Sequence, residues 1–145
     1  MYHQENNNIV RLSMKILISG IFFSMLSSSL FAADLQISLT ASECSVTAST
    51  PQGDGCDTGQ CGGEAGCVCA AKGDFITWTL SGEEKYKMKF DGNSPLKDNC
   101  GKTFSKGSHK CKVKEEVVAG ESYAYEVVIE KCANGSDPRI VIKNS

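Results

Sequence analysis

Histidine is scarce in this chain of 145 residues, which contains only His3 and His109. Hydrolytic catalysis by serine or cysteine needs a nucleophile beside a positioned base, most often a histidine. Neither a Gly-x-Ser-x-Gly nor a Cys-x-x-Cys sequence is present, and the adjacent carboxylates Glu83–Glu84 and Glu115–Glu116 would point to opposite faces of a strand. The sequence therefore predicts a protein that is not an enzyme and has no cofactor.

An excess of positive charge is also missing. The chain has 15 Lys and Arg against 17 Asp and Glu, a formal net charge of −2 with both signs interspersed. Recognition of nucleic acids or of anionic membranes depends on clustered Lys and Arg. We expect neither partner, and we expect instead an unknown protein or small ligand.

The single long apolar run lies near the N-terminus. Lys15 precedes ILISGIFFSML, and a run of serines and the sequence LFAAD follow it. This order is typical of a secretory signal peptide, with cleavage expected between Ala32 and Ala33. The alternative, an uncleaved membrane anchor, needs about 20 predominantly apolar residues. The serines and Asp34 argue against an anchor, so we expect no membrane association after cleavage.

These features divide the chain into three parts. Residues 1–13 are polar and atypical of a signal peptide, whereas Met14 followed by Lys15 is a typical opening, so we interpret 1–13 as a gene-model extension. Residues 14–32 are the expected signal peptide, and 33–145 are one expected domain. The expected location is periplasmic or secreted.

Cysteine is abundant, and all of it follows the expected cleavage point. An even number of cysteines in a small exported domain predicts disulfides, although eight cysteines allow 105 pairings. Five of them lie in 44–69 and three lie outside, so full oxidation requires an odd number of bridges between this segment and the rest. The eight are Cys44, Cys56, Cys61, Cys67, Cys69, Cys100, Cys111 and Cys132.

The segment 44–69 is also rich in glycine and nearly devoid of apolar side chains, so cross-links or a metal must hold it. Four thiolates at Cys56, Cys61, Cys67 and Cys69 would suit Zn(II) or Cu(I), which is the alternative to disulfides. Their spacing differs from the paired Cys-x2-Cys of zinc ribbons. Its acidic residues do not match a calcium-binding EF-hand loop either.

The rest of the chain alternates apolar and polar residues with a period of two, which predicts half-buried strands. In KYKMKF, for example, Tyr86, Met88 and Phe90 would face inward, and the lysines would form an ordinary solvated face. No amphipathic helix of useful length is present. The expected fold is an all-β sandwich of six to seven strands, with 44–69 as a disulfide-rich N-terminal insert. The clearest segments are 35–40, 75–80, 85–90, 109–114, 122–132 and 139–143.

Several strand motifs carry a resemblance over about Lys72–Lys143. They are Trp78-x-Leu80, Tyr86-x-Met88-x-Phe90, Ser94-Pro95-Leu96 with Phe104, Tyr123-x-Tyr125-x-Val127, and Asp137 to Ile142. This region resembles small, uncharacterised exported bacterial proteins with a cupredoxin-like sandwich. The resemblance implies a Greek-key sandwich, cupredoxin-like or immunoglobulin-like, and says little about activity.

A cupredoxin-like fold raises the question of a blue copper centre, which needs two histidines and a cysteine with a weak axial methionine. Only His109 follows the signal peptide, at a position expected to be exposed, and no histidine follows Cys132. We therefore expect no such centre. Two functions remain: a non-catalytic exported binding or interaction module presenting 44–69 as a rigid lobe, and a metal-handling protein that uses the four thiolates of this segment.

Overall fold

The computed structural model describes residues 31–82, 85–98, 100, 103–104, 107–133 and 135–144. The expected extension 1–13 and residues 14–30 of the expected signal peptide lie outside the described residues. Inside them the chain is all-β, and no described helix is long and apolar enough to cross a membrane. The strands are β1 (Asp34–Ser42), β2 (Ser45–Ser49), β3 (Val68–Ala70), β4 (Phe75–Ser81), β5 (Tyr86–Phe90), β6 (Thr103–Phe104), β7 (Gly107–Lys112), β8 (Ser122–Ile129), β9 (Gly135–Ser136) and β10 (Arg139–Ile142).

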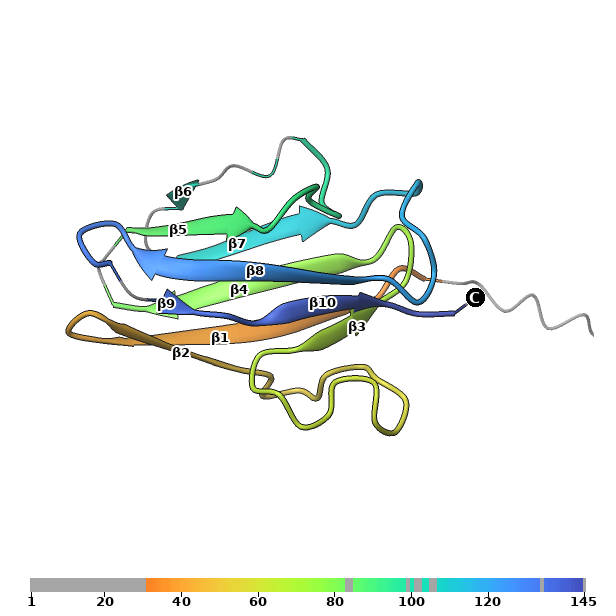
Figure 1. Ribbon diagram of the computed structural model, residues 1–145, viewed down its shortest axis with the longest axis horizontal. Helices are drawn as coiled ribbons and strands as arrows, with labels where there is room; N and C mark the ends of the chain where they lie inside the picture. The colour runs from red at the N-terminus through yellow and green to blue at the C-terminus, as the bar shows by residue number, and fades with distance from the viewer. Residues whose placement is uncertain are drawn as a thin grey trace, which may run out of the picture.

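The strands form two sheets that pack face to face (Figure 1). One has the order β2-β1-β4-β7, and the other has the order β3-β10-β8-β5-β6, with β9 also paired to β8. The pairs β1–β4 and β3–β10 are parallel, and the other pairs are antiparallel. This order is the Greek-key arrangement of a cupredoxin-like sandwich. The predicted fold class is confirmed.

The described residues contain ten strands where six to seven were expected. Two of the additional strands, β2 and β3, lie within the cysteine-rich segment, and two others, β6 and β9, have only two residues each. The strands β3, β6 and β9, of two or three residues, are too short for an alternating pattern to reveal them, because pairing with distant segments decides whether they form. The five residues of β2 do alternate, but they were assigned to the cysteine-rich segment. Residues 44–69 are therefore only partly an insert, since both ends belong to the sheets.

The core lies between the two sheets and follows the predicted alternation. On β4, Ile76, Trp78 and Leu80 are at most 3% exposed, and on β5 Tyr86 is fully buried. Trp78 Nε1 donates a hydrogen bond of 3.0 Å to Tyr125 Oη on β8, and the two rings meet edge to face with centroids 6.0 Å apart. This bond satisfies the buried indole N–H across the interface between the sheets.

Candidate functional site

A groove of about 510 Å³ lies between β5 and the loop that follows it. Met88 and Leu96 are buried beside it, and the half-buried Phe90 adds a third apolar side chain. A cavity of this size, with an apolar lining and a few polar groups, is typical of a small-ligand site. The lining residues are Lys87, Met88, Lys89, Phe90, Gly92, Ser94, Leu96, Lys97, Asp98 and Cys100.

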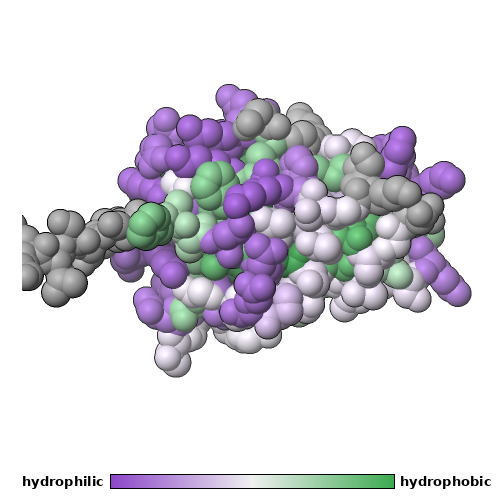
Figure 2. All heavy atoms as spheres, turned by 180° about the vertical axis from the view of Figure 1, so that it is seen from behind, coloured by the Kyte–Doolittle hydropathy of each residue, from purple (hydrophilic) through white to green (hydrophobic). Residues whose placement is uncertain are grey.

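The rim of the groove is positively charged. Lys87, Lys89 and Lys97 are exposed, and the only acidic lining residue, Asp98, forms an ion pair of 3.6 Å with Lys114 Nζ. Lys87 is 3.9 Å from Glu130, whereas Lys89 and Lys97 form no ion pair with a described carboxylate. Figure 2 shows hydrophilic side chains at the upper left of the molecule, the side on which the loop after β5 lies when Figure 1 is turned by 180°. A ligand with an anionic group complements this rim.

The sequence offered two lysines of this rim and no sign of the groove. Lys87 and Lys89 have the alternation of any solvated strand face, and we interpreted them in that way. Lys97 joins them because Lys97 N donates a hydrogen bond to Lys112 O and Leu96 forms a bridge with Val113, which brings the loop back onto the β7 side of the sandwich. The Ser-Pro-Leu sequence before Lys97 was the only available sign of an ordered loop.

Sulfur and imidazole lie close together beside this groove. Cys100, which lines the groove, forms a disulfide with Cys111 on β7. A ring nitrogen of His109, two residues before Cys111 on the same face of the strand, lies within 4.8 Å of both sulfurs. Cys111 is 1% exposed, whereas Cys100 is half-buried. The disulfide is therefore reached from the groove through Cys100.

His109 is not in the exposed position that the sequence suggested. It is half-buried, and its ring lies 3.8 Å from the ring of Phe104, centroid to centroid. Its Nε2 is buried without a hydrogen-bond partner among the described residues, and burial lowers the pKa of the imidazole. The prediction was wrong because β7 is an edge strand whose inward face meets β6, so that His109 packs between the sheets.

An aromatic stack continues from His109 into the core. The ring of Tyr86 lies 5.0 Å from that of Phe104, on which His109 also packs. The hydroxyl of Tyr86 is buried with no described hydrogen-bond partner, and burial raises its pKa to about 12. Tyr86 therefore stays neutral at physiological pH and serves as a packing residue that fixes Phe104 and His109.

A second sulfur cluster holds the lobe, segment 44–69, in which residues 50–67 connect β2 to β3. Disulfides join Cys56 to Cys69 and Cys61 to Cys67. The Sγ atom of Cys61 lies 3.0 Å from that of Cys56 and 4.0 Å from that of Cys69. These cysteines pack with Val141 of β10 as a small second core, so the sulfurs themselves provide the buried surface that the segment otherwise lacks.

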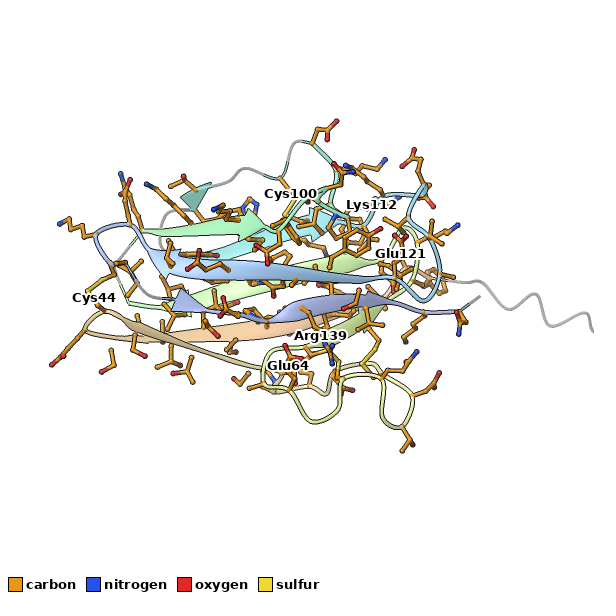
Figure 3. All side chains as sticks on the ribbon, in the orientation of Figure 1. Cys44, Glu64, Cys100, Lys112, Glu121 and Arg139 are labelled. Atoms are coloured by element: carbon orange, nitrogen blue, oxygen red, sulfur yellow. A yellow bond between two sulfur atoms is a disulfide. The ribbon has the colours of Figure 1, made fainter. Side chains whose placement is uncertain are left out.

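Polar contacts fix the same lobe to the six-stranded sheet. Arg139 on β10 forms an ion pair of 2.8 Å with Glu64 and donates a hydrogen bond of 3.3 Å to the carbonyl of Cys61. The amide of Cys69 donates to Asp54 O at 2.7 Å. Figure 3 shows Glu64 and Arg139 on one side of the sandwich and Cys100 on the other. The two sulfur clusters are therefore separate sites.

The remaining disulfide joins Cys44, in the turn between β1 and β2, to Cys132, just after β8. It is the one described bridge that joins segment 44–69 to the rest of the chain. The cysteine count predicted an odd number of such bridges for full oxidation, and the structure has one. Cys132 lies on the connection towards the last strand, but its sulfur is bonded to Cys44, and the one described histidine lies beside Cys111. The described residues therefore do not fit a blue copper centre.

The residues of the expected cleavage point begin the described part of the chain. Ala33 N donates a hydrogen bond of 2.8 Å to Asp74, and Ala33 O accepts one of 2.8 Å from Phe75 N. Ala32 is exposed and has no hydrogen bond to another described residue. Cleavage between Ala32 and Ala33 stays a prediction.

Comparisons with known proteins give similarity in solved structures alone. No family model and no curated protein matches the chain. The multicopper oxidase of Campylobacter jejuni, a metallo-oxidase, is 15% identical with a TM-score of 0.46, over 78% of this chain and 26% of that chain. Multicopper oxidases from Pediococcus acidilactici and Pseudomonas thermotolerans are 12% and 13% identical, with TM-scores of 0.45 and 0.44.

These two matches cover 79% and 78% of this chain, and 29% and 30% of theirs. The chain thus spans less than a third of the length of the three oxidases. The strand order by itself defines the cupredoxin-like sandwich of this chain.

Proposed function

We propose that this domain is a non-catalytic exported binding module, periplasmic or secreted, and that its binding site is the groove beside β5. The observation that carries the proposal is the combination of an apolar lining, from Met88, Phe90 and Leu96, with the lysines of the rim. This combination favours a ligand that has an anionic group and an apolar part. The rigid sandwich would hold the groove preformed, which lowers the entropic cost of binding.

We also propose that the domain is not an enzyme. All described cysteines are in disulfides, and the single described histidine has a disulfide and an aromatic ring as its neighbours. These observations support binding in preference to hydrolysis, because the ring of His109 forms no hydrogen bond with a described hydroxyl or thiol. Membership among small exported bacterial proteins with this sandwich is likewise proposed, from the strand motifs given above.

The test uses the oxidised domain 33–145 and decanoate as the probe, with decanol as the uncharged counterpart. We expect decanoate to cause saturable NMR shifts in residues 87–98 and to bind more weakly as salt increases. The double substitution Lys89→Gln and Lys97→Gln should weaken binding about tenfold, because each exposed lysine contributes up to about 1 kcal/mol. The control Lys131→Gln, an exposed lysine outside the groove, should leave binding unchanged.

Equal binding of decanol and decanoate would reject the role of the lysines. The absence of any saturable shift in the groove would reject the groove as a site for amphipathic anions.

A second candidate function is metal handling by the lobe. The sulfurs of Cys56, Cys61 and Cys69 lie within 4.8 Å of one another, and Cys67 is bonded to Cys61, so reduction would place four thiolates around one point. Four thiolates suit Zn(II) or Cu(I). Thiol counting and intact mass of protein taken from its native compartment separate the two functions. Stoichiometric metal with several free thiols favours the second, and four intact disulfides favour the first.

A further inference from the structure

Of the four disulfides, Cys100–Cys111 alone opens into the groove. Thiol–disulfide exchange requires an incoming thiolate to reach one sulfur in line with the other. Cys100 lines the groove and is half-buried, whereas Cys111 lies on β7 and is 1% exposed. An attacking thiolate can therefore reach Cys100, and the sulfur of Cys111 becomes the leaving group.

The charge of the rim favours attack by an anion. Lys87, Lys89 and Lys97 line the same groove as Cys100, and the acidic lining residue Asp98 is paired with Lys114. Positive charge around a cleft raises the local concentration of anions and stabilises a bound thiolate. A thiol that also carries a carboxylate has two anionic groups, the thiolate and the carboxylate, that the lysines attract.

His109 lies where the leaving thiolate would form. Its ring nitrogen is within 4.8 Å of Cys111 Sγ, and stacking on Phe104 holds the ring in place. Its Nε2 has no hydrogen-bond partner among the described residues, so the imidazole keeps unused hydrogen-bonding capacity. A ring N–H that donates to a thiolate stabilises the charged form of sulfur and makes it a better leaving group.

We propose that Cys100–Cys111 is a thiol–disulfide exchange site for anionic thiols. The thiolate attacks Cys100 Sγ and forms a mixed disulfide, and the bond between the two cysteine sulfurs breaks. Its electron pair goes to Cys111 Sγ, which accepts a hydrogen bond from His109 and then takes a proton from water. No oxidant is consumed, and attack by Cys111 on the mixed disulfide releases the thiol again. The proposal rests on the groove as the binding site of the proposed function.

Cys44–Cys132 provides an internal control, because exposure alone predicts that it reacts first. Cys44 is exposed and Cys132 is half-buried. Neither cysteine lines the groove of Cys100, and the described histidine lies at the other disulfide. The site of the first adduct therefore separates a built exchange site from simple accessibility.

The experiment treats the oxidised domain 33–145 with a limiting amount of 3-mercaptopropionate, traps free thiols with an alkylating reagent, and maps the adduct by peptide mass spectrometry. We expect the mixed disulfide on Cys100 and the alkyl group on Cys111. The rate per thiolate should exceed those of 2-mercaptoethanol and cysteamine by about tenfold and should fall with salt. Lys89→Gln with Lys97→Gln should remove most of this preference, and Lys131→Gln should not.

His109→Phe should lower the rate at Cys100 about tenfold, since hydrogen bonds to charged groups are among the stronger ones. His109→Gln keeps an N–H donor and should recover part of the rate, whereas a purely structural role would not distinguish donor from non-donor. Unchanged decanoate binding shows that each variant keeps the groove. Equal rates for His109→Phe and the original domain would remove His109 from the proposal.

A first adduct on Cys44 or Cys132, or equal rates for the three thiols, would overturn the exchange site. Decanoate binding shows whether the groove still binds an anionic ligand when the exchange reaction at Cys100 fails. If decanoate binds but no thiol reacts at Cys100, the groove stands and the exchange site fails. If decanoate binds and also protects Cys100, both stand, and if it does not bind, the groove fails.

Discussion

Removal of the Cys44–Cys132 disulfide should be the most damaging loss of a single cross-link. This bridge joins the β1–β2 turn of one sheet to the end of β8 in the other, across a sequence separation of 88 residues (Figure 3 labels Cys44). Cys44 is exposed and Cys132 half-buried, so the double substitution Cys44→Ala and Cys132→Ala leaves little buried cavity. The dominant effect is therefore the larger conformational freedom of the unfolded chain.

The magnitude follows from the closed loop. Loop closure over 88 residues corresponds to about 4.6 kcal/mol at 25 °C in the chain-entropy model. The disulfides nested inside it span 13 and 11 residues and shorten the effective loop. Because the dependence is logarithmic, they lower the value only to about 4.3 kcal/mol. The same relation gives about 2.2 kcal/mol for Cys61–Cys67, which closes 6 residues.

Urea denaturation followed by the fluorescence of Trp78 measures the change. With a slope of about 2 kcal/mol per molar urea, the midpoint should fall by about 2 M, and the slope itself should rise because the unfolded state expands. The control Ser45→Ala changes an exposed residue next to the bridge and should shift the free energy of unfolding by less than about 0.5 kcal/mol. A loss below about 1 kcal/mol in the double variant would refute the argument and show that the core alone limits unfolding.

Three further predictions concern the core, the lobe and pH. Tyr125→Phe leaves the buried indole N–H of Trp78 without its acceptor and should cost about 1–3 kcal/mol in urea denaturation; no change would mean that the N–H finds water. Gly66→Ala should destabilise more than Gly63→Ala, because both have positive φ but only at Gly66 would a Cβ collide with β2, and equal melting temperatures would contradict this. Burial lowers the pKa of His109, so the unfolded chain binds more protons than the folded domain at acidic pH. The stability should therefore fall as the pH drops below about 6.5, the ordinary pKa of histidine. In the same melting assay, a His109→Phe variant should show a flatter dependence of the melting temperature on pH.

Much of the fold could be predicted because its signal is local. In Tyr86, Met88 and the adjacent lysines Lys87 and Lys89, alternation alone separates the buried from the solvated face, and a period of two is a property of consecutive residues. The three-residue strand β3 could not be predicted in the same way. Its residues form a strand because β10 lies beside them, and that neighbourhood is absent from their own sequence. The alternation of Ser45–Ser49 in β2 was present in the sequence but was not separated from the cysteine-rich segment.

The candidate site could be predicted less well. Lys87 and Lys89 were visible, yet nothing in the sequence separated them from an ordinary strand face until the loop carrying Lys97 was placed opposite them. His109, which precedes Lys110 and Cys111 in a predicted strand, was expected to be exposed. Only the packing of Phe104 from the other sheet buries it beside Cys111.

The sequence by itself determined the all-β class and, from five cysteines inside 44–69 and three outside, that an odd number of bridges would leave this segment. Both follow from residue order and counting. The tertiary structure alone decided that this bridge is Cys44–Cys132 and that Cys100 opens into a groove with His109 behind it. These outcomes depend on distances between segments far apart in the chain, and only the packing of the two sheets sets those distances.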